Sequence, residues 1–453
     1  MNKNRRNVLK LAAHSPALFA LNAYAGNHLK ENIGHSEKTD FGIIDWDGSL
    51  ISDPRKLFDL PKDFSYKVLM SSGEMMHDGL PYGGRPDGMA AFRLNDKINA
   101  LVVNHETRNL DDRLMETNAY MRQNGSPFDG GTTTIILDND GKNVISAKRS
   151  LTGTQDNCAG GKTPWNTWIS CEETDLENHG YAFEVDPSID SGKTYKRLTG
   201  MGRFKREAVA IDANDTKGTV YQTEDDDVGL FYRFIPKSNG NLTESGQLEA
   251  LRIRGFENSN NSDGEIDVGQ SFDVDWVKID DPRASNIKTR EQGRMNGATS
   301  FNGGEGIICT NNANGESIVF FTCKDGGQFG FGQIWAYDPK NSMITLFYES
   351  NSIENFWEGD NINVTPWGDL IICEDNDSFA CRLLGCTPSG MMYPLGRVSG
   401  NSGSEIAGIC FSNDEKIMYL NIQDEGKTIA VSGDWERIRR YRDRMDVNKI
   451  HYK

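Results

Sequence analysis

The sequence has few histidines, no long apolar run beyond its first residues and a deficit of basic side chains. Its 453 residues include 7 histidines, and 49 lysines and arginines face 66 aspartates and glutamates, for a net charge of -17. So acidic a chain repels polyanions, which excludes nucleic acid as a partner. After residue 25 no apolar run reaches the roughly 18 residues of a membrane span, so we expect no stable membrane insertion. The few histidines exclude a histidine-rich zinc site.

The first 25 residues have the pattern of a twin-arginine export signal. Arg5 and Arg6 precede a short, weakly apolar stretch that ends near Leu21, and Ala23-Tyr24-Ala25 is a small-residue cleavage site. The twin-arginine export machinery carries folded proteins, and its usual passengers need a cofactor before they cross. We therefore expect a periplasmic or secreted protein that binds metal.

The chain contains internal repeats. Residues 163–173 and 365–375 share T-P-W, I-x-C-E and a second acid at the same offsets. A second unit, a glycine followed by alternating aromatics and a turn proline, recurs at residues 180–187, 229–236 and 332–339. Each unit is typical of a short strand closed by a turn. Cys171 and Cys373 occupy equivalent repeat positions, where we expect them to be core residues.

Six short strands end in polar or acidic tips, and their spacing predicts the fold. They lie at residues 101–106, 163–173, 218–226, 318–325, 365–375 and 417–423. Radial repetition of four-stranded blades fits this spacing, so the sequence predicts an all-β fold, a β-propeller of about six blades with loop insertions. The longest gap, about 237 to 300, predicts an excursion from the sheets.

These patterns divide the chain into four parts. We expect the signal peptide at residues 1–25, an N-terminal extension at 26–60, the propeller at 61–434 and a basic C-terminal tail at 435–453, with helical periodicity from Trp435 to Met445. We expect the mature protein to be a monomer.

Acids at the strand tips are candidate metal ligands, because strand ends of different blades converge on one face of a propeller. Oxygen ligands favour Ca²⁺ or oxidised iron. Solvated strand ends are the alternative for the doubled acids. Four consecutive acids, Glu224 to Asp227, repel each other, and a divalent cation would relieve that repulsion. The tip candidates include Glu224, Asp225, Glu374 and Asp375.

An ordered set of motifs resembles the PhoX family of alkaline phosphatases. The motifs are NCAGG at 157–161, WISCEE at 168–173, EAVAID at 207–212, TEDD at 223–226, GEG at 304–306, TPWGDL at 365–370 and EIAG at 405–408. The resemblance implies an exported phosphomonoesterase on a propeller scaffold, which releases inorganic phosphate from small phosphate esters at a Ca²⁺ and Fe³⁺ site. By position it implies Cys158 as a thiolate ligand of iron, and Glu173, Glu207 and Glu305 as carboxylate ligands.

One position departs from the family pattern. Family members often have an arginine two residues before the glutamate that aligns with Glu305, and this chain has Gly303. Loss of a guanidinium weakens the stabilisation of transition-state charge. Arg206 or Lys162, each beside a proposed ligand segment, are the candidates to replace it. Two alternatives stay open: a calcium-binding propeller that has lost catalysis, and a calcium-dependent lactonase-like hydrolase.

Overall fold

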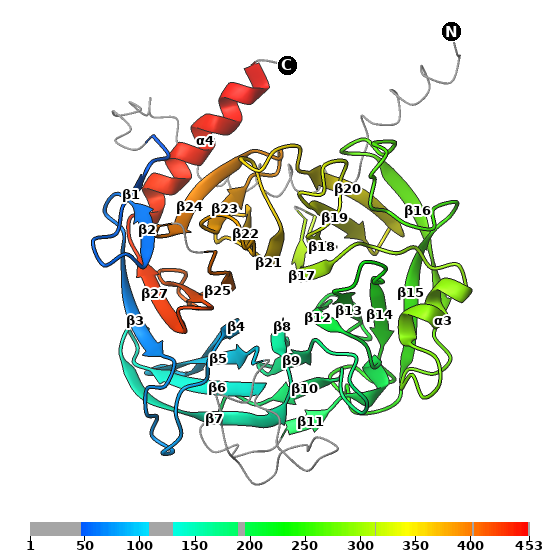
Figure 1. The fold of residues 1–453 in the computed structure, drawn as a ribbon, viewed down its shortest axis with the longest axis horizontal. Helices are drawn as coiled ribbons and strands as arrows, with labels where there is room; N and C mark the ends of the chain where they lie inside the picture. Colours follow the sequence, from blue (N-terminus) through cyan, green and yellow to red (C-terminus); the bar gives the residue numbers. More distant parts are fainter. Residues whose placement is uncertain (1–46, 108–129, 189–194, 313, 401–402, 452–453) are drawn as a thin grey trace.

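The computed structural model describes residues 47–107, 130–188, 195–312, 314–400 and 403–451, which form a ring of antiparallel sheets (Figure 1). The predicted signal peptide lies outside the described residues, as does most of the predicted extension. Within the described ranges, no helix has the length and apolar character to cross a bilayer.

The ring consists of six groups of four antiparallel strands, as blades of a β-propeller do. In chain order the strands of the first three are β4 (Pro86–Asn95), β5 (Ile98–His105), β6 (Gly130–Leu137), β7 (Val144–Thr154); β8 (Asn157–Lys162), β9 (Trp168–Glu172), β10 (Ala182–Val185), β11 (Tyr195–Arg197); and β12 (Arg206–Ile211), β13 (Val220–Glu224), β14 (Tyr232–Ile235), β15 (Gln247–Ile253). Those of the next two are β17 (Gly304–Asn311), β18 (Ser317–Cys323), β19 (Gln333–Asp338), β20 (Met343–Glu349); and β21 (Gly359–Val364), β22 (Leu370–Glu374), β23 (Arg382–Cys386), β24 (Met392–Val398). The all-β propeller predicted from the sequence is confirmed.

The sixth blade closes the ring by pairing the two ends of the propeller. It contains β25 (Ile406–Phe411), β26 (Met418–Ile422), β27 (Lys427–Ser432) and, as its outermost strand, β3 (Ser65–Ser71) from the start of the chain. β27 and β3 pair antiparallel from Lys427 and Ser71 to Ser432 and Ser65. Because the first strand is held by the last blade, no open seam remains between the ends.

The predicted strand tips fall on the second strand of each blade. They belong to β5, β9, β13, β18, β22 and β26, and the glycine-aromatic units form the third strands β10, β14 and β19. The innermost strands are therefore a different set, β4, β8, β12, β17, β21 and β25, and each of these contacts the next around the axis. Cys171 and Cys373 are fully buried, as predicted.

The remaining elements decorate the outside of the ring. β1 (Leu50–Ile51) and β2 (Phe58–Pro61) extend the fifth blade beyond β24. In the predicted excursion, β16 (Ser271–Lys278) pairs with both β15 and β20 and so joins two blades, and α3 (Thr289–Met295) lies beside β15. Before the third blade, η4 (Thr199–Met201) forms one short 3₁₀ turn. The excursion is thus partly built into the sheets.

The inner strands approach one another closely, because small residues line their contacts. A Cβ added to Gly88 would lie 2.5 Å from the Cα of Ala159, and one added to Gly306 would lie 2.7 Å from the carbonyl oxygen of Asp360. Gly408 has φ +64, and its Cβ would lie 2.4 Å from the carbonyl oxygen of Asp87. Larger side chains at these positions would push neighbouring blades apart.

The basic tail forms helix α4 (Trp435–His451), which packs on the fifth and sixth blades. Ile438 is fully buried, and the buried Arg442 donates to both carboxylate oxygens of Asp369 at 2.7–2.9 Å. Asp369 also accepts from Tyr393 and Trp367. The tail is therefore part of the folded body.

Arg442→Met should destabilise the protein by about 3–5 kcal/mol, because it leaves the Asp369 carboxylate buried without its cation. Arg439→Met, on an exposed side of the same helix, is the matched control and should change stability by less than about 0.5 kcal/mol. Chemical denaturation monitored by circular dichroism would measure both. Equal stability of the two variants would show that α4 does not depend on this ion pair.

Candidate metal centre and active site

Each innermost strand carries a β-bulge near its first residue. In five of them the pairing register shifts across a side chain that can bind a metal, and these five are Asp87, Cys158, Glu207, Glu305 and Asp360. A bulge takes such a residue out of the ladder and redirects its side chain. In the sixth blade the bulge in β25 lacks a ligand, and Glu405, one residue before the strand, supplies the acid.

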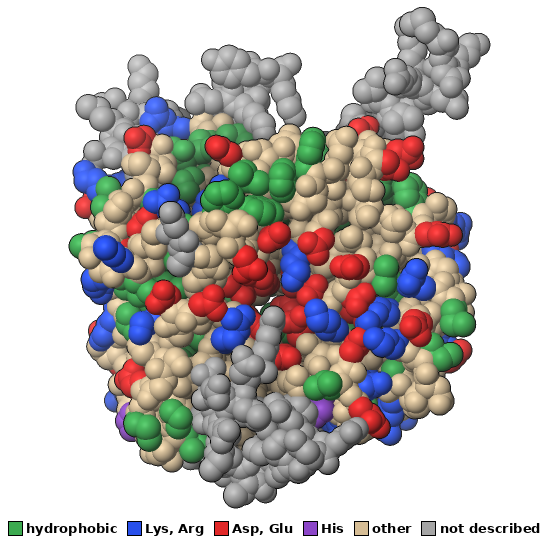
Figure 2. Space-filling model, in the orientation of Figure 1, with side chains coloured by type: hydrophobic (Ala, Val, Ile, Leu, Met, Phe, Trp, Pro, Cys, Tyr) green, Lys and Arg blue, Asp and Glu red, His purple; other side chains and the backbone are tan. Residues whose placement is uncertain are grey.

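The bulged residues meet acids from the second strands at one end of the ring axis. In each of four triads the ligand atoms lie within 4.8 Å of one another. The triads are Cys158, Glu173 and Glu207; Glu207, Glu305 and Asp360; Asp360, Asp375 and Glu405; and Asp87, Glu106 and Glu405. Since neighbouring triads share a residue, they form one continuous group of eight carboxylates and one thiol, here called the acid cluster. Figure 2 shows acidic side chains gathered at the centre of this face.

Burial and mutual repulsion raise the pKa values of several members of the acid cluster. Burial, with Glu106 and Asp225 nearby, raises the pKa of Glu173 to about 8. Burial and Asp360 raise the pKa of Asp375 to about 7. The same two causes hold the pKa values of Asp87, Glu207, Glu305, Glu405 and the Cys158 thiol well above their ordinary values. Ionisation of these groups therefore needs added positive charge.

Among the described residues, three basic side chains border the acid cluster. Lys205 Nζ lies 2.8 Å from Glu173 Oε1 and 2.7 Å from Asp225 Oδ2. Lys324 Nζ lies 2.6 Å from Glu305 Oε1 and 3.3 Å from the same oxygen of Asp225. Arg85 Nη2 lies 3.2 Å from Glu106 Oε2. Despite its burial, Asp225 has a lowered pKa because of the Lys324 and Lys205 ammonium groups.

Comparison with known proteins identifies the family. The sequence profile described as alkaline phosphatase PhoX matches residues 47–152 and 140–426. The chain belongs to the PhoX family. Membership makes it a phosphomonoesterase of the alkaline phosphatase type, and confirms the resemblance found in the sequence.

Comparison with solved structures finds the fold of this chain in a PhoX protein. Pseudomonas fluorescens PhoX in complex with vanadate, a transition state analogue, is 18% identical, with a TM-score of 0.67 over 86% of this chain and 98% of that one. A gluconolactonase from Xanthomonas campestris is 9% identical, with a TM-score of 0.42 over 82% and 96% of the two chains. The PQQ domain of pyranose dehydrogenase from Coprinopsis cinerea is 11% identical, with a TM-score of 0.44 over 84% and 98%. Curated protein sequences give no match.

Within this PhoX-family fold, six of the predicted metal ligands lie at the ring axis. Cys158, Glu173, Glu207, Glu305 and Asp375 belong to the acid cluster, and Asp225 borders it through Lys205 and Lys324. Cys158 Sγ also donates to the carbonyl oxygens of Arg206 and Glu207, at 3.3 and 3.4 Å. Their metal-binding role remains a prediction.

Glu224 and Glu374, the other two predicted ligands, face away from the acid cluster. Glu224 accepts from the Tyr232 hydroxyl at 2.6 Å and from Arg290 Nη1 at 2.8 Å. Glu374 accepts from Arg382 Nε at 2.8 Å and from its backbone N–H at 2.9 Å. Successive strand residues point to opposite sides, so only the second acid of each pair reaches the axis. The predicted metal-binding role of Glu224 and Glu374 is therefore wrong, and both residues have a structural role.

Arg206 is not placed to bind phosphate. Its guanidinium is fully buried, where Nη1 donates to the Gly180 carbonyl, Nη2 to the Met201 and Gly202 carbonyls, and Nε to Gln222 Oε1 at 2.9 Å. The side chain also lies over the Phe204 ring. These contacts use its donors to connect loops behind the acid cluster, so the predicted catalytic role is corrected to a structural one.

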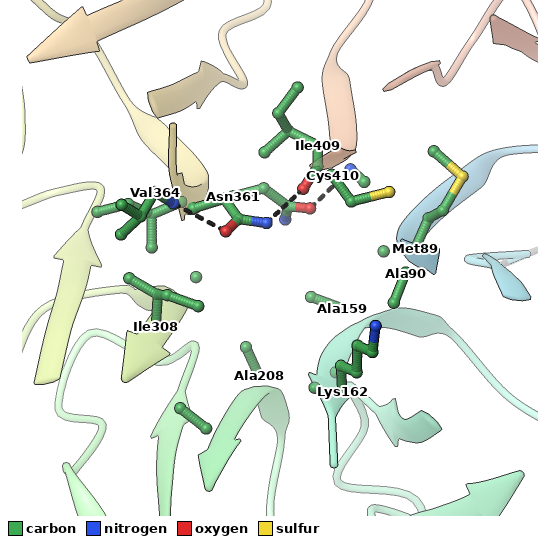
Figure 3. A pocket seen from close by; sticks show the side chains of 18 of the residues that line it. Met89, Ala90, Ala159, Lys162, Ala208, Ile308, Asn361, Val364, Ile409 and Cys410 are labelled. Carbon is green, nitrogen blue, oxygen red and sulfur yellow. Dashed lines mark hydrogen bonds between the residues drawn. The ribbon is translucent and has the colours of Figure 1, made fainter. Parts of the chain in front are cut away.

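Lys162 lies in the axial channel, beyond the acid cluster. The inner strands line a cavity of ≈ 570 Å³ that extends from Gly88 and Ala159 toward their far ends (Figure 3). Lys162 is at the last residue of β8, four positions after Cys158, and its Nζ donates to the carbonyl oxygen of Ala91 at 2.7 Å. The structure therefore corrects the expectation that Lys162 lies beside the metal ligands.

Sequence reasoning missed several residues of the site. Asp87, Asp360 and Glu405 were outside the predicted ligand set, as were the cations Lys205, Lys324 and Arg85. One signal was available for Asp87: in Asp87-Gly88, as in Cys158-Ala159, Glu207-Ala208 and Glu305-Gly306, a ligand-type residue precedes a small one at the start of a strand, whereas Asp360 and Glu405 lack this pattern. The cations carry no comparable signal.

The acid cluster fits a group of metal ions. Eight carboxylates and a thiol face three basic side chains, and Asp87 Oδ1 is buried without a hydrogen-bond donor among the described residues. Carboxylate oxygens are the ligands of Ca²⁺, while a single thiolate among them suits iron. The donor set therefore agrees with the two metals that the sequence resemblance implies.

Metal-free protein should lose stability as the pH rises from about 4 to about 8. The pKa of Glu173 is 4.5 in its unperturbed state and about 8 in the fold, and that of Asp375 rises from 3.8 to about 7. In this window the folded chain holds protons that the unfolded chain has released, so the free energy of unfolding falls with pH. Melting temperatures of chelator-treated protein at several pH values measure this.

Metal-loaded protein is the control for this measurement. Metals bind the deprotonated carboxylates, so its melting temperature should not fall over the same range. A metal-free protein whose stability rises between pH 5 and pH 8 would contradict the raised pKa values.

Proposed function

We propose that the acid cluster holds Ca²⁺ and Fe³⁺ and that the protein hydrolyses phosphate monoesters there, releasing inorganic phosphate. The observation that carries this is the chain of four triads, in which shared carboxylates bring several metal positions within reach of one small ligand. Its membership of the PhoX family gives the class of reaction.

Each triad has a chemistry that suits one of the metals. The triad of Cys158, Glu173 and Glu207 would hold iron, since it alone contains a thiol. The carboxylate triads would hold calcium, the ion that takes oxygen ligands in flexible geometry. Bound metals would polarise the phosphoryl group and stabilise the attacking and leaving oxygens of an in-line displacement. A serine nucleophile is not required.

Lys324 is the side chain we propose to bind phosphate. It lies directly after β18, at the position where other blades place Glu106, Glu173, Asp225 and Asp375, so it introduces a cation among acids. Its ammonium lies between Glu305 and Asp225, with the side chain 25% exposed at the mouth of the acid cluster. A preorganised cation in a site of low dielectric stabilises the charge that develops on transferring phosphoryl oxygens.

Gly303 explains how Lys324 fits. A Cβ at residue 303 would lie 2.8 Å from Lys324 Cγ, and the backbone there has φ +55. The Lys324 N–H donates to the Gly303 carbonyl at 2.8 Å, which fixes the two segments side by side. The missing arginine therefore leaves the space that the Lys324 stem occupies, and we propose that the cation has moved from one segment to the other.

We also propose that the protein is exported from the cytoplasm. The twin-arginine pattern of residues 1–25 supports delivery of the folded, metal-loaded protein to the periplasm or beyond. There it would act as a monomer on small phosphate esters.

Glu173→Gln tests the metal site and the activity together. Metal-loaded wild-type protein should contain calcium and iron and should hydrolyse a chromogenic phosphate ester. Glu173→Gln removes a negative ligand at constant size, so the iron content should fall. The turnover rate should fall at least about 100-fold. Elemental analysis and initial rates measure the two effects.

Glu172→Gln is the neighbouring control. Glu172 accepts from His179 at 2.7 Å and from the Gly180 backbone at 2.9 Å, so its loss should lower stability while the metal content is retained. A wild-type protein with calcium and iron but no turnover at any pH would refute the phosphatase proposal, and one that binds neither metal would refute the metal assignment.

Lys324→Met should lower kcat/KM by about 10² to 10³, the scale of losing one preorganised donor, without loss of metal. Lys324→Arg should retain most of the activity, because it keeps the charge. Steady-state kinetics on one ester, with metal analysis of each variant, provide the measurement.

Lys162→Met is the matched control, since it removes a lysine from the axial channel and should leave kcat/KM unchanged. If Lys162→Met abolished activity and Lys324→Met did not, the phosphate would bind from the channel side.

A further inference from the structure

Four aromatic side chains form a continuous row on the face that carries the acid cluster. The rings of Phe329 and Phe331 stack with centroids 6.2 Å apart, Phe331 meets Trp357 edge to face at 6.2 Å, and Trp357 lies 5.6 Å from Phe379. We call these four residues the aromatic row. They come from three separate loops, between β18 and β19, β20 and β21, and β22 and β23.

The aromatic row leaves much of its surface in solvent. Phe329 is 56% exposed and Phe379 is 55% exposed, while Ile353 beside them is 38% exposed. Figure 2 shows hydrophobic side chains gathered on this face next to the acidic centre. Contiguous exposed aromatic side chains on an otherwise acidic surface mark a binding site more often than a packing defect.

The aromatic row is joined to the acid cluster through one residue. Glu358 follows Trp357, its N–H donates to the Phe331 carbonyl at 3.0 Å, and its own carbonyl accepts from the Asp375 N–H at 2.9 Å. Asp360 of the acid cluster lies two residues further along. Glu358 has φ 47, which turns the chain sharply between the row and the cluster. A ligand held at the acid cluster therefore has the aromatic row as its neighbouring surface.

We propose that the aromatic row binds the base of a nucleoside monophosphate whose phosphate lies at the acid cluster. This inference rests on the proposed phosphatase function and names its substrate class. Any of the nucleobases can stack on an aromatic side chain, because every base has a π-face. Asp360 is three positions after Trp357, a reach of at most about 10 Å. The ribose supplies spacing of this kind, whereas the ring of a simple aryl phosphate lies next to its phosphorus.

A groove beside the aromatic row provides a wall for the base. It has a volume of ≈ 350 Å³ and is lined by Trp357, Phe379, Arg382 and Arg397. Arg382 already donates to Glu374, so what the groove offers a planar ring is stacking on Trp357 and Phe379.

The test compares adenosine 5′-monophosphate with ribose 5-phosphate on metal-loaded protein. Both esters release the same type of primary alcohol, so a difference in kcat/KM reports contacts to the base. Wild-type protein should prefer the nucleotide by about tenfold or more. Trp357→Ala and Phe379→Ala should each remove most of this preference and leave kcat/KM for ribose 5-phosphate within about twofold. Met295→Ala, an exposed apolar side chain at the end of α3, is the control that should change neither.

Equal kcat/KM for the two esters in wild-type protein would overturn the inference, as would an equal loss for both in Trp357→Ala. If neither ester is turned over, the phosphatase proposal fails, and calorimetric binding of adenosine 5′-monophosphate then tests the aromatic row by itself. Weaker binding by Trp357→Ala, by about tenfold, would support the inference, and unchanged binding would overturn it.

Discussion

The close approach of six innermost strands around one axis is the constraint on which the rest of the structure depends. At that radius there is room only for small residues such as Gly88, Ala159 and Gly306, and each strand relieves the crowding with a bulge. The bulges, in turn, direct ligand-type side chains to the axis. Packing and chemistry therefore meet at the same residues: a larger side chain beside the axis would separate the blades and disperse the ligands.

The same constraint makes the acid cluster costly to the fold. Eight carboxylates and a thiol are buried together in overlapping triads, and the pKa values of Glu207 and Glu405 among them rise in consequence. Most of the carboxylates that resemble them in sequence are stabilised differently: Glu172, Glu224 and Glu374 each have hydrogen-bond donors or cations within their own blade. In the cluster, three basic side chains face eight carboxylates and a thiol among the described residues, and this excess of acid is the physical reason to assign it metal ions.

The basic side chains around the acid cluster belong to loops and not to strands. Lys205, Lys324 and Arg85 approach the acid cluster from connections, each directly before or directly after a strand of the propeller. Loops change more readily than the ladder that they connect. Lys324, which we propose to bind phosphate, and Trp357 and Phe379, which we propose to contact the rest of the substrate, all lie in such connections.

The sequence by itself determined the propeller, the positions of the second strands and the paired acids at their tips, because alternation and repeats are local properties of the chain. It also pointed to Cys158, Glu207 and Glu305 through resemblance. Only the tertiary structure decided which member of each acid pair faces the axis, that Arg206 is used by backbone carbonyls, and that Lys324 and the aromatic row lie beside the cluster. The reason is that these facts depend on where six blades meet, and contacts between residues as distant as Asp87 and Glu405 leave no trace in local sequence.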